Sequence, residues 1–286
     1  MAVLPRVDLY ARAVSDRDEI AAFLRTDRIY AAYSLGDLDG PNRHRCSWGM
    51  AYDDLGRPIA LAMHQDGLIP RPLFLMGDPA GCREILSSVI RPRDAYFMGT
   101  EPLDEAAADL YELDAPQLLL RMAVNRDGFL PFAGSADRLL PADVEDLNRL
   151  YQLGFRGGFP ASVLEDGVYY GVRVRGRLVS AAGTHAINTR EGVAVVGNVM
   201  THVDFRGHDF AKMVTSAVTA DLLQRVDDVV LNVHADNAPA VAAYRRLGYV
   251  DTDLLTERLG RRRAGGWGLM RPLREAIRLP WLRDPR

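Results

Sequence analysis

The chain has 286 residues, of which 48% are hydrophobic and 26% are charged, and its formal net charge at pH 7 is −3. This composition is typical of a folded protein, since it supplies enough apolar residues for one large core or two of ordinary size and contains no biased stretch that would indicate disorder. No apolar run has the length of a signal peptide or of the roughly 18 residues that span a membrane, so we expect a cytoplasmic protein without a membrane partner.

The basic residues are concentrated at the C-terminus. Residues 258–286 contain nine arginines and only two acidic residues, Glu275 and Asp284, so the remainder of the chain is acidic and favours a cationic substrate. The basic segment lacks the interleaved aromatic residues of a stacking surface, and we therefore predict no nucleic-acid partner. We interpret residues 260–286 as a solvated or subunit-packing tail; in the second case the protein is a homodimer.

The cysteines indicate neither a disulfide framework nor a metal site. Cys46 and Cys82 are the only two, and they lack the paired spacing of structural zinc ligands. We predict two free thiols and no bound metal.

In the first half, the pattern predicts two strands within "SWGMAYDDLGRPIALAMHQDG" (47–67), followed by the strand "RPLFLM", the turn "GDPAG" and the helix "CREILSSVI". The strand "DAYFMG", the helix "LDEAAADLYEL" and the strand "QLLLRMAV" come next. A Gly- and Pro-containing stretch over residues 126–136 reads as a linker.

The second half repeats this order. "GVYYGVRV" and "LVSAAGTHAI" form a predicted hairpin, and "VAVVGNVMTHV" reads as a buried strand. The apolar spacing then becomes helical in "AKMVTSAVTADLLQRV", and "DVVLNVHA", "APAVAAYRRLGY" and "VDTDLLTERL" follow as strand, helix and strand. Gly56 and Arg57 correspond to Gly176 and Arg177, an internal echo of about 120 residues that indicates two similar folds in tandem.

The turn between the buried strand and the long helix is predicted to bind a phosphate. A helix N-terminus has backbone N–H groups without partners and a partial positive charge, so it binds anions. The turn contains Arg206, Gly207, His208, Asp209, Phe210 and Ala211. Asp209 is unexpected there, because its carboxylate either repels the phosphate or caps the following helix.

Together with this turn, Asn237, Ala240, Tyr244 and Gly248 in "ADNAPAVAAYRRLGYV" resemble the GNAT superfamily of acetyl-CoA-dependent acetyltransferases. Arg206 and Ala211 match the ends of that family's loop, whereas Asp209 replaces its inner glycine. The resemblance covers about residues 137–259 and implies an α+β fold of two tandem GNAT-like domains, each with a mixed, mostly antiparallel sheet flanked by helices. The first, residues 1–125, lacks the loop and the Asn-to-Tyr helix, so we expect it to bind no cofactor and to form a wall of the substrate cleft or a subunit contact, with residues 31–40 at that edge.

The resemblance also implies roles for individual residues. The strand end at Val199, Met200 and Thr201 would separate from its neighbour and bind the pantetheine arm of acetyl-CoA, and residues 206–211 would bind the pyrophosphate. Asn237 and Ala240 would lie along the pantetheine. Tyr244 would protonate the departing thiolate after direct attack by a primary amine, from a small molecule or a peptide, on the acetyl carbonyl.

The general base and the activity itself stay open at this stage. His185, Glu191 and His234 are candidates for the base, and water is another. A non-catalytic protein that senses acyl-CoA is the alternative function, because no titratable residue stands at the inward positions Val193, Val195 and Gly197.

Overall fold

The computed structural model describes residues 9–152 and 158–263. The first half contains β1 (Tyr10–Val14), α1 (Arg17–Leu24), η1 (Arg25–Asp27), α2 (Ala32–Asp39), η2 (Arg43–Arg45), β2 (Cys46–Tyr52), β3 (Pro58–Gln65), β4 (Pro72–Gly77), α3 (Pro79–Ser88), β5 (Asp94–Gly99), α4 (Glu101–Ala108), β6 (Tyr111–Leu113) and β7 (Gln117–Asn125). The second half contains β8 (Asp137–Arg138), η3 (Pro141–Asp143), α5 (Val144–Tyr151), α6 (Ser162–Asp166), β9 (Tyr170–Val174), β10 (Arg177–Asn188), β11 (Val193–Thr201), η4 (Val203–Phe205), α7 (Phe210–Leu222), β12 (Asp228–His234), α8 (Ala238–Arg246) and β13 (Val250–Arg262).

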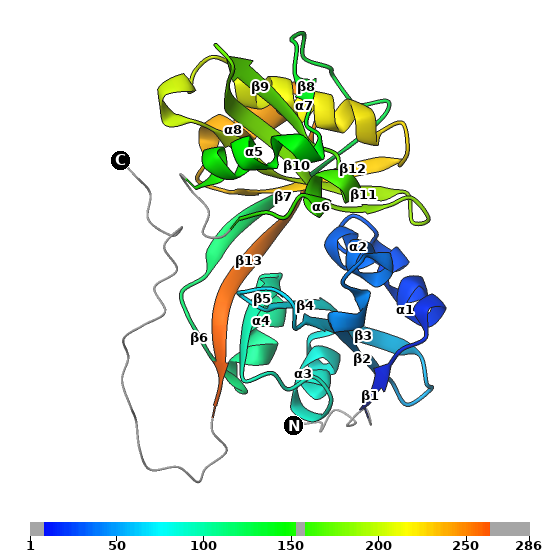
Figure 1. The fold of residues 1–286 in the computed structure, drawn as a ribbon. Helices are drawn as coiled ribbons and strands as arrows, with labels where there is room; N and C mark the ends of the chain where they lie inside the picture. Colours follow the sequence, from blue (N-terminus) through cyan, green and yellow to red (C-terminus); the bar gives the residue numbers. More distant parts are fainter. Residues whose placement is uncertain (1–8, 153–157, 264–286) are drawn as a thin grey trace, which may run out of the picture.

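The strands form one mixed sheet of 13 strands in the order β1-β2-β3-β4-β5-β13-β7-β12-β11-β10-β9-β8, and β6 pairs with β13 (Figure 1). The predicted α+β class with mostly antiparallel strands is confirmed, since among the described strands only β4–β5 and β11–β12 are parallel neighbours. Each parallel pair occupies the same place in its half, which agrees with the internal echo in the sequence.

The two halves exchange their last strands. β7 belongs to the first half by sequence, yet it lies between β12 and β13, and it pairs with β12 along its length from Asn125 opposite Asp228 to Leu119 opposite His234. β13 pairs with β7 through its first part and with β5 through Thr256–Arg261. Figure 1 shows β7 and β13 running from one half of the molecule into the other. Neither half therefore completes its sheet without the other.

The segments on either side of these strands also differ from a simple tandem. β13 continues to Arg262 and pairs there with β6, so the first residues of the predicted basic tail belong to a strand. Residues 264–286 lie outside the described residues. The predicted linker packs against the second half, where the amide of Phe132 donates to Oγ of Ser216 at 2.9 Å and the amide of Leu130 donates to the carbonyl of Leu247 at 3.0 Å.

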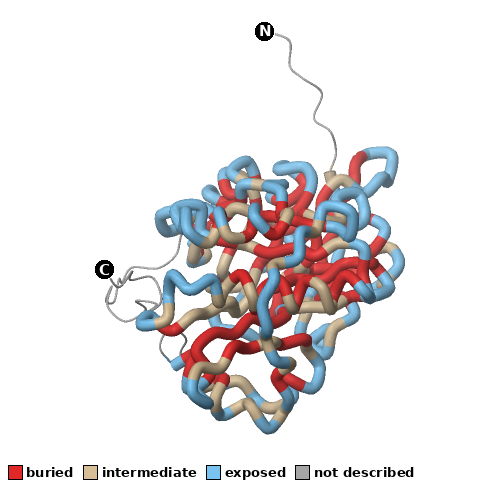
Figure 2. The backbone as a smooth tube through the Cα atoms, turned by 90° about the horizontal axis from the view of Figure 1, so that it is seen from above, coloured by how far each residue is buried: buried red, intermediate tan, exposed pale blue. Residues whose placement is uncertain are grey.

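Buried stretches of the backbone run through the interior and exposed stretches lie around them (Figure 2). α7 packs on β9, β10 and β11, whereas α3 packs on β1, β2 and β3. The side chains of α7 that face the sheet, such as Val214, Val218 and Leu222, are fully buried. No helix in the described ranges is long and apolar enough to cross a membrane.

α2 of the first half contacts β10 and β11 of the second. Gly36 makes this approach possible, since a Cβ there would lie 2.2 Å from the Cβ of Ala186. Asn188 on β10 donates its amide to the carbonyl of Leu35 at 2.6 Å. The first half therefore closes one side of the β10–β11 hairpin, while a role of residues 31–40 in walling a substrate cleft stays a prediction.

Ion pairs hold the halves together beside this contact. Glu191, which is only 5% exposed, accepts hydrogen bonds from Arg25 at 2.7 and 2.8 Å and from Arg17 at 2.7 Å. Arg28 pairs with Asp228 at the start of β12. The hydrogen bonds from Arg25 and Arg17 lower the pKa of Glu191 below its ordinary range. The carboxylate is thus ionised in the fold and bridges the two halves.

We expect Glu191→Gln to lower the free energy of unfolding by about 1–3 kcal/mol, because it removes a buried charge from two arginines that stay partly solvated. The folded-state pKa is the lower one, so this stabilisation is present above the ordinary value of 4.5 and is lost as the pH falls through the folded-state pKa. Thermal denaturation of both proteins between neutral and acidic pH measures this. Glu105→Gln, at an exposed glutamate on α4, is the control; an equal loss in both variants would contradict the bridging role.

Candidate active site

β11 and β12 separate partway along their length. Their parallel pairing runs from Val193 opposite Asp228 to Val196 opposite Leu231 and stops there. β11 continues to Thr201 paired only with β10, while β12 continues to His234 paired with β7. The edge of β11 over residues 197–201 therefore faces β12 without a partner strand, as predicted for the strand end at Val199, Met200 and Thr201. Their contact with pantetheine stays a prediction.

A bulge shapes this free edge. Asn198 has φ of 53°, and the register of β10 and β11 shifts between Ala181 and Gly183. The Asn198 carbonyl accepts a hydrogen bond from the Tyr151 hydroxyl of α5, and its side-chain amide donates to the Tyr169 hydroxyl at 3.1 Å. The bulge bends β11 away from β12 and holds the opening in place.

The turn after β11 presents free amides at the start of α7. Gly207 and Asp209 have φ of 79° and 62°. Among the described residues no acceptor bonds the backbone N–H groups of 207–212, and the amide of Met213 is the first that reaches back, to the Asp209 carbonyl at 3.0 Å. Open amides at the positive end of a 13-residue helix fit an anionic phosphate group.

Side chains around the turn leave this end open. His208 bonds the carbonyl of Arg206 through Nδ1 at 2.9 Å, and its ring stacks on Phe210. Arg206 is exposed, and Ala211 adds only a methyl group to the first turn. These predicted phosphate contacts lie together as a compact group.

Asp209 does not cap α7. It stands at the N-cap position, but its carboxylate accepts no hydrogen bond from the first turn, so the capping alternative is wrong. Oδ1 instead lies 2.8 Å from Nζ of Lys212, a buried ammonium that also lies over the Phe132 ring at 4.5 Å. Asp209 therefore neutralises a cation that would otherwise favour an anion in the turn.

The corresponding turn of the first half is closed. Asp78 caps α3, because its carboxylate accepts from the amide of Gly81 at 2.9 Å, and Pro79 at the first helical position has no N–H. The negative charge at this helix end is thus supplied by the chain itself. This arrangement supports the expectation that the first half binds no cofactor.

α8 places the remaining predicted residues. Asn237 caps the helix through a hydrogen bond from the amide of Ala240 to Oδ1 at 3.3 Å. Tyr244 is 8% exposed, and within the described chain its hydroxyl makes no hydrogen bond. Burial raises its pKa to about 12, so the hydroxyl stays protonated at neutral pH. A buried, unpaired donor on this helix is able to protonate a leaving group.

Comparison with known proteins agrees with this geometry. Residues 169–259 match the family model of the FR47-like proteins. A stretch of 98 residues is 38% identical to the mycothiol acetyltransferase of Saccharomonospora viridis, a match that covers 31% of this chain and 32% of that protein. The chain is also similar in structure to a tandem GNAT protein from the clavulanic acid biosynthesis pathway, at 14% identity and a TM-score of 0.54 over 91% of this chain and all of that one.

The chain has the fold of the tandem GNAT proteins. A putative GNAT acetyltransferase from Novosphingobium aromaticivorans shares the fold, at 24% identity and a TM-score of 0.51 over 68% of this chain and 88% of that one. The chain spans about a third of the length of the curated relative it matches. Its kinship with GNAT acetyltransferases supports an acyltransferase, while the acceptor has to be argued from the site.

The three candidates for the general base differ in their surroundings. Glu191 is bonded to Arg17 and Arg25 and is not free to take a proton. His234 ends β12 and is exposed. His185 lies on β10, and its ring covers Gly197 of the neighbouring strand β11. A Cβ at Gly197 would be 2.0 Å from two atoms of that ring. Gly197 is the first residue beyond the last β11–β12 pair, so His185 stands at the opening.

The surroundings of His185 also suit a base. Part of its surface is exposed, but protein atoms crowd the ring, and this desolvation lowers its pKa below the ordinary value. The imidazole is therefore neutral at physiological pH and able to accept a proton. Its other neighbour is the Tyr33 ring of α2, with centroids 5.8 Å apart.

Sequence reasoning did not single out Tyr33 or Glu257. Tyr33 falls within residues 31–40, which we expect at the edge of the substrate cleft, and Glu257 lies on the exchanged strand β13. No local motif connects either residue with the loop or with α8.

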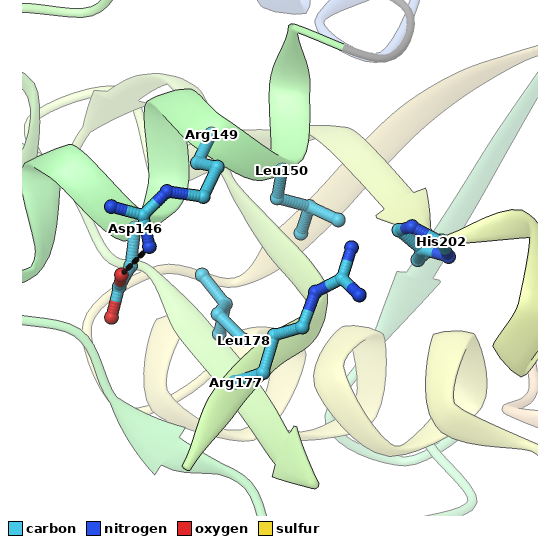
Figure 3. Close-up of a pocket in the computed structure, with 6 residues that line it drawn as sticks. All are labelled: Asp146, Arg149, Leu150, Arg177, Leu178 and His202. Atoms are coloured by element: carbon cyan, nitrogen blue, oxygen red, sulfur yellow. Dashed lines mark hydrogen bonds and ion pairs between the residues drawn. The ribbon is translucent and has the colours of Figure 1, made fainter.

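A small pocket beside the loop is not the acceptor site. Figure 3 shows its lining, with Arg149 paired to Asp146 and the Arg177 side chain extended between Leu150 and His202. Its volume of about 20 Å³ is enough for a water molecule only. An acceptor amine does not fit there.

We expect Asp209→Gly and Asp209→Asn to tighten acetyl-CoA binding by roughly 3- to 30-fold. Both remove a negative charge whose repulsion of the phosphate costs about 1 kcal/mol, and both leave the Lys212 ammonium without its carboxylate partner. The glycine variant also removes the cost of a left-handed aspartate. Calorimetric titration at two salt concentrations measures this, and the gain shrinks at high salt. Asp204→Asn, at an exposed carboxylate outside the turn, is the control. Equal or weaker binding by Asp209→Asn would show that the charge does not oppose the cofactor.

Proposed function

We propose that this GNAT protein is an acetyl-CoA-dependent N-acetyltransferase that moves an acetyl group to a primary amine by direct attack. The observation that carries the proposal is the free edge of β11, which begins where β11 and β12 separate and has His185 over Gly197 at its start. Tyr33 lies against His185 and interacts electrostatically with Tyr244, which supports a place for the Tyr244 hydroxyl near this opening. The open amides at the start of α7 supply the phosphate site that acetyl-CoA requires.

Each residue has one task in this reaction. His185 accepts the proton that the amine loses as its nitrogen forms the C–N bond to the acetyl carbonyl. Backbone amides on the free edge of β11 stabilise the negative oxygen. Tyr244 donates its proton to the sulfur as the C–S bond breaks, and solvent then restores the protonation states of His185 and Tyr244. Acetyl-CoA, when bound, supplies the activated thioester.

Acyl-CoA sensing without catalysis is the second candidate, and the Asp209–Lys212 pair favours it because it weakens the phosphate site. Release of free thiol from acetyl-CoA in the presence of a panel of amines separates the two. Amine-dependent thiol release supports the enzyme; binding of acetyl-CoA without any release with all amines supports the sensor.

We expect Tyr244→Phe to lower kcat by roughly 10- to 1000-fold with little change in acetyl-CoA affinity, because the proton donor acts only as the thiolate leaves. Steady-state kinetics and calorimetry measure the two quantities. Tyr249→Phe is the matched control, since this buried tyrosine lies 6.1 Å away between ring centroids and bonds Thr219 instead. If kcat is unchanged in Tyr244→Phe, the residue serves packing alone.

We expect kcat/KM, expressed per neutral amine, to fall only below the ordinary histidine pKa of 6.5, because desolvation lowers the pKa of His185 and keeps the base neutral down to that range. His185→Gln should lower kcat by roughly 100-fold or more and remove this acidic limb. His64→Gln, at a histidine on β3 of the first half, is the control and should leave the pH profile as in the wild type. An acidic limb that persists in His185→Gln would assign the base to another group.

A further inference from the structure

Glu257 is a carboxylate without a counter-ion in a half-buried position. Its Oε2 accepts a hydrogen bond from the Tyr96 hydroxyl of β5. In the described part of the chain no lysine, arginine or histidine lies within ion-pair distance of it, and burial raises its pKa. Most other partly buried carboxylates here, such as Glu191, Asp221 and Asp228, have arginine partners. Burial disfavours the ionised form of such a carboxylate, and a cation bound beside it would stabilise that form.

The nearest fixed cation does not pair with it. Arg121 on β7 is completely buried, and its guanidinium donates to the carbonyls of Tyr30 and Ile29 and to Oδ1 of Asn232. It interacts with Glu257 only through the longer-range field, as does His234 from the end of β12. The Oε1 atom of Glu257 accepts no hydrogen bond from any described residue.

Tyr33 connects Glu257 with the reaction centre. Its ring lies against His185, and the Arg121 guanidinium is 5.3 Å from its centroid. The Tyr33 hydroxyl interacts electrostatically with both Glu257 and Tyr244, and within the described residues it makes no hydrogen bond. Tyr33 therefore lies between Glu257 and the two proposed catalytic groups, His185 and Tyr244. This side of the site is formed by the first half and by β13.

We propose that Glu257, held by Tyr96, binds a second cationic group of the acceptor, so that the preferred substrate is a small amine with another positive charge besides the reacting nitrogen. This inference rests on the proposed N-acetyltransferase function. The reacting nitrogen must be neutral to attack, and it lies near His185, so the charge opposite Glu257 belongs to a separate group of the same molecule. The acidic character of the chain outside its C-terminal segment favours approach of such a molecule.

The test uses the full chain saturated with CoA and two matched pairs of probes, putrescine with butylamine and cadaverine with pentylamine. Calorimetry should show that at least one diamine binds roughly 10-fold or more tightly than its monoamine in the wild type. Glu257→Gln should abolish most of that preference and leave monoamine binding within about 2-fold. Glu112→Gln, at an exposed glutamate on the neighbouring strand β6, should behave as the wild type.

Two results would overturn the proposal. The first is that the wild-type protein prefers neither diamine over its monoamine, and the second is that the preference for a diamine survives in Glu257→Gln. Thiol release from acetyl-CoA is measured in parallel. A protein that releases thiol with monoamines but does not prefer diamines retains the acetyltransferase function and loses only the role of Glu257. A protein that binds diamines through Glu257 but never releases thiol loses the transferase function instead.

Discussion

The exchange of β7 and β13 is the constraint on which the rest of the structure depends. A strand edge leaves backbone N–H and C=O groups without partners, and each half would have such an edge without the strand from the other. β12, one side of the candidate active site, is therefore supported along its length by a strand of the first half. β13 in turn carries Glu257 from the second half to Tyr96 of the first. The two halves form one sheet and, between them, one site.

The two halves differ in how an aspartate is used at the N-terminus of the helix between the parallel strands. Both place a helix after the strand that begins the parallel pair, and both have an aspartate in the turn. Asp78 caps its helix and supplies the negative charge itself, whereas Asp209 turns away to Lys212 and leaves the helix end open. The same side chain thus closes one helix end and leaves the other available for a phosphate, and only the hydrogen-bond partner differs.

The titratable groups between the halves differ in their hydrogen-bond and ion-pair partners. Glu191 has two arginines and bridges the halves, so it takes no part in proton transfer. His185 has no charged partner among the described residues, and its desolvation favours the neutral form. Glu257 accepts a hydrogen bond from a tyrosine and has no cation beside it in the described part of the chain. Titratable residues that look equivalent in the sequence therefore have three different surroundings, because their partners come from distant segments.

The sequence by itself determined the elements and the local motifs. Apolar periodicity and turn residues predicted most strands and helices between residues 47 and 259, and the Asn237-to-Gly248 spacing carried the resemblance that implied the α+β class. The predicted helix "LDEAAADLYEL" is wrong at its end, since Tyr111–Leu113 form β6 against β13, a distant strand that no local pattern records. Only the tertiary structure decided the strand exchange, the arginine partners of Glu191, the ion pair of Asp209, the contact of Tyr33 with His185 and that of Glu257 with Tyr96. Strand pairing and burial join residues more than a hundred positions apart, and no local pattern records which distant partner a side chain meets.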